Sequence, residues 1–352
     1  MSSPPPRTDI PSLTGLRGVA ALMVVLYHAN ESFIRASGYA SPHIFHGRLF
    51  VDLFYVLSGF VLCHVYVTDT RNISWRKFFA ARVARVYPLH VLTALLGAAG
   101  LYALSKMSGQ GLPPELTIGQ AIRELTLTQA MPFIWKDLIW NSHSWSISVE
   151  FYTYVLIFPI IYIWLHRVRP STSVLISGTL MAALIPFLFF ADIHPARGAG
   201  AFLRASIGFL AGWSTWLVWK SPAKRLRPST VLAVMVALFA GTQFYPTSLD
   251  DPWYVLPLMP VLVYGIAGMT SPLDRILSGR VLSYLGLVSY SVYLIHPLIL
   301  KATQVVFSRM GLFQYGMGLF IAVSLALIIP CSYVSWRFFE LPSRDWLKRR
   351  LD

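Results

Sequence analysis

Charged side chains are scarce in this sequence, because Asp, Glu, Lys and Arg together make up only 12% of its 352 residues. Soluble domains carry about 25% charged residues, so this chain has too few polar groups to cover a soluble globule. Hydrophobic residues reach 55% and gather in long runs. The composition excludes an ordinary soluble domain and predicts a protein that is embedded in a membrane.

Cysteine and acidic residues are also few. Cys63 and Cys331 lie far apart in apolar stretches, so neither a disulfide framework nor a metal site is expected from them. Asp and Glu number 15 against 29 Lys and Arg. Because these cations gather at the ends of apolar runs, membrane topology explains them better than nucleic-acid binding does.

Ten apolar segments approach the roughly 20 residues that a transmembrane helix needs. We find no internal repeat and therefore expect one all-α domain over residues 1–352, a bundle of about ten transmembrane helices. A polar N-terminal segment, 1–13, and a basic tail, 337–352, flank it. The predicted helices span residues 15–33, 48–67, 87–105, 145–166, 172–191, 200–219, 230–246, 253–270, 282–301 and 314–336.

The distribution of Lys and Arg predicts the orientation of the bundle. Most of the 29 cations fall on one side if the N-terminus is cytoplasmic, which places both termini in the cytoplasm. No small-residue cleavage site follows the first apolar run, so we expect it to remain as a helix. Glycines and prolines within 106–144 predict a loop, and 134–140 has the composition of an interfacial aromatic stretch.

Four ionisable side chains fall in the predicted outer half of the bundle, each on a separate helix: His28, Asp52, Glu150 and His296. Ionisable groups are costly within a bilayer and mark functional sites by default. His28 follows Arg17 by eleven residues, about three turns or 16 Å along one helix face. The competing interpretation is a set of unrelated polar contacts, with His28 a hydrogen-bonded core residue.

A group of cations lies at the predicted cytoplasmic end of the third helix. It contains Arg76, Lys77, Arg82 and Arg85, directly before a Tyr-Pro pair. Arginine binds phosphate oxygens through two parallel N–H groups, so this group suits an anionic cofactor. The alternative is ordinary cytoplasmic charge that contacts lipid headgroups.

Six short motifs occur in order along nearly the whole chain. They are Leu16-Arg17-Gly18 with Tyr27-His28, Phe50-Val51-Asp52 continuing to Ser58-Gly59-Phe60, Arg82-Val83-Ala84-Arg85-Val86-Tyr87-Pro88, Trp145-Ser146-Ile147-Ser148-Val149-Glu150, Tyr290-Ser291-Val292-Tyr293-Leu294-Ile295-His296-Pro297, and Phe339-Glu340-Leu341-Pro342. In this order the chain resembles the acyltransferase-3 family of membrane acyltransferases. It departs from the family at Ala81-Arg82, where many members have paired arginines, although Arg76 and Lys77 lie nearby.

The resemblance implies an integral membrane O-acyltransferase of the bacterial inner (plasma) membrane. Such an enzyme moves an acyl group, in the first instance acetyl, from cytoplasmic acyl-CoA to a hydroxyl of a carbohydrate. Exopolysaccharide, lipopolysaccharide and lipid-linked precursors are the expected acceptors, and a macrolide or other secreted small molecule is the alternative. The expected partners are membrane lipid, acyl-CoA and the acceptor, with no nucleic acid and no metal. The absence of a hydrolase-like domain after the last helix matches a stand-alone member.

Acyl transfer to an alcohol needs a base, donors to the thioester oxygen and close approach of the reactants. We predict His28 as the base, because imidazole titrates near neutral pH, with Glu150 or, as second choice, Asp52 orienting it. Direct transfer is favoured, while an acyl intermediate on His28 or Ser146 stays open. The predicted catalytic residues are His28, Glu150, Ser146 and Asp52; the coenzyme A ligands are Arg17, Arg82, Arg85, Arg76 and Lys77; the substrate contacts are Trp145, Ser148, Ser58, Tyr290, Tyr293 and His296.

A secondary transporter or proton-coupled permease is the competing class, because buried His, Glu and Asp side chains also form proton relays. Transporters often contain repeated halves with broken helices at matching positions, and the sequence shows no such symmetry. A non-catalytic scaffold would leave the layer of ionisable groups unexplained. The residues therefore favour an enzyme.

Overall fold

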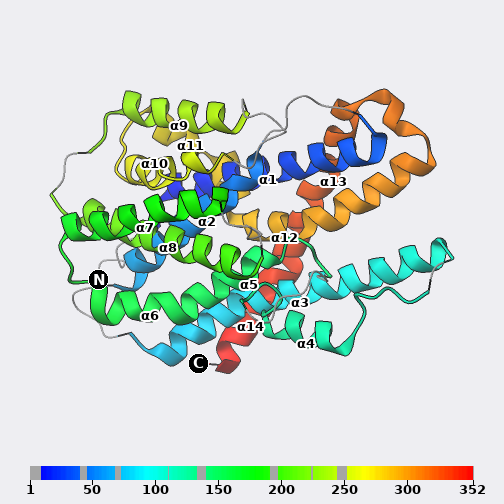
Figure 1. Cartoon of the computed structure of the whole chain (residues 1–352), viewed down its shortest axis with the longest axis horizontal. Helices are drawn as coiled ribbons and strands as arrows, with labels where there is room; N and C mark the ends of the chain where they lie inside the picture. Colours follow the sequence, from blue (N-terminus) through cyan, green and yellow to red (C-terminus); the bar gives the residue numbers. More distant parts are fainter. Residues whose placement is uncertain are drawn as a thin grey trace, which may run out of the picture.

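The structure is a computed structural model of the chain and describes residues 9–39, 46–67, 73–109, 111–132, 140–190, 197–222, 225–243 and 252–351. Every regular element within these ranges is a helix, as Figure 1 shows, so the all-α prediction is confirmed. Helices satisfy their own backbone N–H and C=O groups, which is the condition for crossing lipid.

Within the described residues, eight helical stretches are long and apolar enough to cross a membrane. Two shorter apolar helices, α9 (Pro228–Gln243) and α10 (Leu258–Ala267), fall on the other two predicted segments. The protein is therefore a multi-pass membrane protein. The eight stretches are α1 (Pro11–Ser37); η1 (Gly47–Leu49) with α2 (Phe50–Tyr66); α3 (Trp75–Met107); α5 (Trp145–Tyr152) with η2 (Thr153–Ile157), α6 (Phe158–Ile160) and η3 (Ile161–Leu165); α7 (Pro170–Phe190); α8 (Gly198–Lys220); α12 (Arg280–Arg309); and α13 (Met317–Ser335) with η6 (Trp336–Glu340) and α14 (Leu341–Leu351).

Two predicted boundaries are wrong. Helix α3 begins at Trp75 instead of residue 87, so the cationic group belongs to the helix and Pro88 lies inside it. Alanine, lysine and arginine favour helices, and membrane helices tolerate an internal proline. The predicted basic tail is helical as far as Leu351, because α14 follows η6 without a break.

The predicted loop between the third and fourth spanning stretches contains a further helix, α4 (Ile118–Thr126), which lies beside α3 in Figure 1. The Thr117 hydroxyl accepts a hydrogen bond from the Gln120 N–H at 3.1 Å and so caps its start. Most of the predicted aromatic stretch, 134–140, lies outside the described residues. The remaining short helices are η4 (Trp253–Val255), α11 (Pro272–Leu277) and η5 (Leu312–Tyr315).

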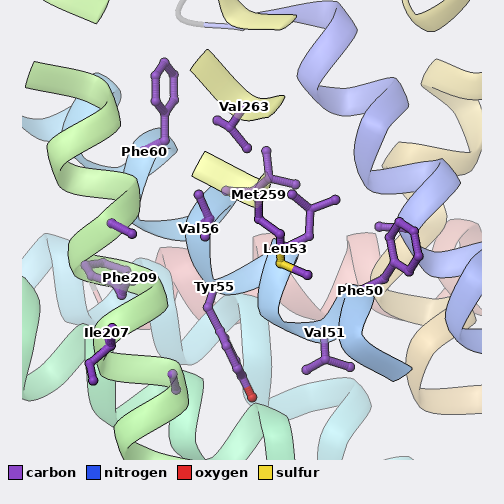
Figure 2. Packing of buried hydrophobic residues seen from close by; sticks show 14 of the residues in the cluster. Phe50, Val51, Leu53, Tyr55, Val56, Phe60, Ile207, Phe209, Met259 and Val263 are labelled. Carbon is purple, nitrogen blue, oxygen red and sulfur yellow. The ribbon is translucent and has the colours of Figure 1, made fainter. Parts of the chain in front are cut away.

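Helices α2 and α8 pack closely together at the centre of the bundle. A Cβ atom on Gly59 would collide with the Phe209 carbonyl, and one on Gly212 with the Val56 carbonyl. Small residues let membrane helices approach closely, because lipid offers little hydrophobic drive for association. Figure 2 shows Tyr55, Val56 and Phe60 on α2, Ile207 and Phe209 on α8, and Met259 and Val263 on α10.

Helix α1 lies along α12. A Cβ atom on Gly286 of α12 would collide with the Thr14 carbonyl of α1, so this contact also depends on a small residue. The close approach brings Arg17 and His28 on α1 to the side of the bundle that holds Tyr293 and His296.

Candidate active site

A pocket of about 140 Å³ lies inside the bundle, between α1, α2, α3, α5 and α12. Polar side chains from several helices reach it, in a helix-bundle interior where an unpaired charge is costly. The other predicted site residues lie elsewhere. The predicted residues that line the pocket are Arg17, Ser58, Arg82, Arg85, Ser146, Glu150, Tyr290 and Tyr293.

Glu150 anchors the polar wall of this pocket. The Tyr154 hydroxyl donates a hydrogen bond to Glu150 Oε1 at 2.5 Å, and the Ser58 hydroxyl donates to the same oxygen. Arg17 interacts electrostatically with this carboxylate across the pocket. Glu150 therefore ties α5 to α2 and η2. Within the described part of the chain, His28 is not among its bonded partners.

Arg85 is held by a carboxylate from the far end of the chain. It forms an ion pair with Glu340 Oε1, while the Ser291 hydroxyl donates to Glu340 Oε2 at 2.6 Å. Glu340 is only 2% exposed, and a buried carboxylate is stable only with such partners. The Arg85 guanidinium also lies 5.0 Å from the centre of the Tyr290 ring. An anionic ligand would have to share Arg85 with Glu340. Glu340 was not among the site residues predicted from the sequence.

Arg82 lies within a group of aromatic rings. Its guanidinium is 5.7 Å from the ring centre of Tyr66 and 5.8 Å from those of Phe78 and Tyr154. Its Nη2 donates a long 3.4 Å bond to the Tyr66 hydroxyl, and its buried Nε has no partner among the described residues. A guanidinium that is fixed in place and still has a donor to offer suits a phosphate oxygen.

Arg76 and Lys77 do not line the pocket. Both are exposed on the first turn of α3, and Arg76 Nε donates to the backbone oxygen of Leu351 at 3.2 Å. Six helical residues, about 9 Å of rise, separate Arg76 from Arg82. Because α3 begins earlier than predicted, these two cations lie at its N-terminal end, away from Arg85.

Asp52 is buried in an ion pair that the sequence did not reveal. Arg204 on α8 donates from Nη2 to Asp52 Oδ2 at 2.5 Å and from Nε to Oδ1 at 3.1 Å. The Arg204 guanidinium lies 4.7 Å from the ring centre of Trp253 and 5.6 Å from that of Trp145. The structure thus gives Asp52 a different partner from the predicted one, because it neutralises Arg204 on α8. Trp145 covers the same arginine.

Ser148 has a structural contact where a substrate contact was predicted. Its hydroxyl donates to the Leu127 carbonyl at 2.5 Å and accepts from the Ala130 N–H at 3.3 Å. The side chain is fully buried. These bonds fasten α5 to the turn that follows α4.

Ser146 and Tyr293 form a hydrogen-bonded pair at the edge of the pocket, with 2.6 Å between their hydroxyl oxygens. The Tyr293 hydroxyl is also 3.2 Å from the His143 carbonyl oxygen, and its ring centre is 5.7 Å from that of His296. The pair therefore borders the pocket on one side and a group of histidines on the other.

His28, His143 and His296 form this group, which we call the histidine cluster. The His143 ring centre lies 3.9 Å from that of His28 and 4.9 Å from that of His296, while His28 and His296 are 5.4 Å apart. Burial, followed by repulsion from the other two imidazoles, holds the pKa of His143 well below its usual range. His143 is therefore neutral near pH 7 and keeps a nitrogen lone pair.

The carboxylate beside His28 is Glu31, not the predicted Glu150. His28 Nδ1 lies 3.3 Å from Glu31 Oε2, and Arg35 donates to Glu31 Oε1 at 2.6 Å. Residues three apart on a helix are neighbours, so the spacing of His28 and Glu31 was the available signal. His143 was missed because it lies outside the helices, in the turn two residues before α5 begins.

Apolar spanning helices around buried ionisable groups define a polytopic membrane protein with a polar site inside the bundle. The family model of the acyltransferase domain matches residues 10–337 of the chain. The chain therefore belongs to this family, the acyltransferase-3 family that the six motifs indicated. Membership of a family of membrane acyltransferases argues against the transporter interpretation.

Several curated proteins are similar to the chain. It is 26% identical over 337 residues to acyltransferase MdmB of Streptomyces mycarofaciens, covering 85% of the chain and 81% of that protein. It is 23% identical to peptidoglycan O-acetyltransferase OatA of Listeria monocytogenes, covering 96% of the chain and 56% of that protein. It is 24% identical to O-acetyltransferase OatA of Staphylococcus aureus, covering 95% of the chain and 57% of that protein. The chain thus spans little more than half of these two O-acetyltransferases. No solved structure matches the chain.

Proposed function

We propose that the protein transfers an acyl group, in the first instance acetyl, from acyl-CoA to a hydroxyl group of a carbohydrate. The observation that carries this proposal is one pocket within the bundle that has arginines along one wall and, beyond the Ser146–Tyr293 pair, a cluster of imidazoles. Two relatives are named O-acetyltransferases, one of them a peptidoglycan O-acetyltransferase, and these names support a hydroxyl on a carbohydrate as the acceptor.

The proposed donor site lies around Arg82 and Arg17. Arg82 has a buried Nε–H to offer, and Arg17 faces the same pocket from α1. Arg85 would join them by exchanging part of its pairing with Glu340. In the orientation predicted from the Lys and Arg distribution, with both termini cytoplasmic, this end of α3 would face the cytoplasm and its acyl-CoA. The phosphates would bind there, and the acyl end of the donor would extend toward the histidine cluster.

The proposed transfer takes place beside His28. The acceptor hydroxyl loses its proton to the imidazole as its oxygen bonds to the acyl carbon. The carbon–sulfur bond then breaks, and the proton passes from His28 to the departing thiolate. Glu31 would orient the imidazole, and the hydroxyls of Ser146 and Tyr293 would donate to the thioester oxygen. An acyl-enzyme on His28 or Ser146 is the alternative sequence of steps.

The test of the base is His28→Ala in protein purified into nanodiscs, with labelled acetyl-CoA and a soluble glycan acceptor. A general base raises the rate of such a reaction by about 10²- to 10⁴-fold, so we expect the rate of acyl transfer to fall by at least about a hundredfold. His64→Ala is the matched control, because His64 lies on α2 against Phe60 and Trp219 and outside the pocket lining. Wild-type transfer by His28→Ala would exclude His28 as the base.

The test of the donor site is the affinity for acetyl-CoA, measured by calorimetry. We expect Arg82→Ala to weaken binding at least tenfold, because a charge-assisted hydrogen bond contributes about 1.5–3 kcal/mol. Arg123→Ala on α4 is the control, because Arg123 lies outside the pocket lining. If both Arg82→Ala and Arg85→Ala bind acetyl-CoA with unchanged affinity, the coenzyme A phosphates do not bind at this site.

A further inference from the structure

Three segments that are distant in sequence bring imidazoles together in the histidine cluster. His28 comes from α1, His143 from the turn before α5, and His296 from α12. Each ring has one nitrogen that could bind a metal, and these three nitrogens all lie within 4.8 Å of one another. The spacing along the sequence gave no indication of this arrangement.

The Nδ1 atom of each ring already has a partner. His28 Nδ1 lies 3.3 Å from Glu31 Oε2, and His143 Nδ1 lies 2.9 Å from the Ser142 hydroxyl. His296 Nδ1 lies 3.1 Å from the Val292 carbonyl oxygen. Because a carbonyl only accepts, His296 Nδ1 carries the proton and its Nε2 carries the lone pair.

The His296 Nε2 atom is buried and has no partner among the described residues. Burying a nitrogen without a hydrogen-bond partner costs free energy, and a ligand bound to this lone pair would offset that cost. Histidines that bind metals usually donate their other ring N–H to a carboxylate, a carbonyl or a similar acceptor. The three Nδ1 contacts follow that pattern and leave three Nε2 atoms available to one ligand.

We propose that the Nε2 atoms of His28, His143 and His296 form a site for one divalent transition-metal ion of the zinc class. Zinc binds imidazole nitrogen at about 2.0–2.1 Å, and three protein ligands leave a fourth position open. Nitrogens around such an ion lie about 3.3–3.5 Å apart, so small side-chain rotations would bring these three into place. The Glu31 carboxylate, behind His28, would complement the charge of the ion.

The consequence for activity rests on the proposed function. A metal on His28 Nε2 occupies the lone pair that would otherwise accept the proton of the acceptor hydroxyl. The bound ion would therefore act as a reversible inhibitor, and acyl transfer would require the metal-free form. Metal binding itself does not depend on this role, so the two claims can be tested separately.

Binding is tested on full-length protein in nanodiscs, treated with a chelator and then titrated with Co²⁺ and with Zn²⁺. We expect one equivalent per chain, with the visible absorption of four-coordinate Co²⁺ and displacement of Co²⁺ by Zn²⁺. His143→Ala and His296→Gln should each weaken binding at least tenfold, whereas His64→Ala should not. Mg²⁺, which prefers oxygen ligands, should not compete. No saturable binding, or equal binding by His143→Ala, would overturn the proposal.

The functional arm measures acyl transfer with and without Zn²⁺. We expect zinc to inhibit the wild-type protein more than tenfold, a chelator to reverse this, and the fractional inhibition to be lost in His143→Ala. Zinc that restores activity to chelated protein would support the metal site and would overturn the role of His28 as base. One-equivalent Co²⁺ binding in a protein that transfers no acyl group would support the site while the proposed function fails.

Discussion

The buried pair of Asp52 and Arg204 separates a structural role of Asp52 from the catalytic role that its sequence suggested. In Asp52→Asn, Arg204 would keep its charge while 4% exposed and covered by the rings of Trp253 and Trp145. Removing one partner of a buried ion pair costs about 3–5 kcal/mol, because the remaining charge has no counterion. We expect a loss of stability of that order.

Replacing both partners should cost much less than the single change. Asp52→Leu combined with Arg204→Met removes both charges, and such apolar replacements are often close to neutral. The coupling free energy from the double-mutant cycle should therefore be several kcal/mol. Asp345→Asn is the control, because its 3.4 Å contact with Arg344 is exposed and should contribute little.

The measurement is unfolding by SDS titration in mixed micelles, with acyl transfer per folded molecule determined in parallel. We expect Asp52→Asn to unfold at lower SDS and its folded fraction to retain transfer close to wild type. Wild-type stability together with a large loss of transfer would refute the structural interpretation and indicate a catalytic role for Asp52.

Three further predictions concern packing and pH. Burial raises the pKa of Glu124 to about 7. The protonated carboxyl is therefore favoured in the folded state, and its contribution to stability is complete below the unfolded pKa of about 4.3. That contribution is lost as the pH rises through about 7. Thermal melts should therefore show Glu124→Gln to be more stable than wild type at pH 8 but not at pH 4, and a constant difference would contradict the shift. Gly59→Ala would collide with the Phe209 carbonyl and should cost at least about 1–3 kcal/mol, whereas Gly100→Ala, which has open space around it, should gain up to about 1 kcal/mol; equal melting of the two would disprove the close contact. Ser148→Ala should lower stability by about 1 kcal/mol and leave the KM for the acceptor unchanged, and a raised KM would restore it as a substrate contact.

The spanning helices were predictable because a run of apolar residues of sufficient length has few alternatives in lipid. The start of α3 was not, because clustered cations are typical of the end of a membrane helix, whereas Arg82 and Arg85 lie within this one. Helix α4 was missed because a nine-residue helix inside a loop has no spanning run and begins at an ordinary Thr cap.

The sequence did not reveal which polar residues of different helices meet. Helical rise gives depth along one helix, but lateral position depends on how separate helices pack. Of the four ionisable residues predicted for one layer, only Glu150 lines the pocket, and Arg17, which was predicted nearer the cytoplasmic end, lines it as well. Asp52 lies on the same helix as Ser58 and yet turns toward Arg204, a partner that no spacing in the sequence identifies.

The hydrogen bond between Ser146 and Tyr293 has a consequence for the cell that contains this protein. Every bacterium that makes such a protein has to bring two reactants to the two sides of this pair. With 2.6 Å between the two oxygens, nothing fits between the hydroxyls, so a donor chain that reaches from the pocket to the histidine cluster has to displace the pair or pass beside it. Tyr293→Ala removes the phenol and should let longer acyl chains reach the cluster.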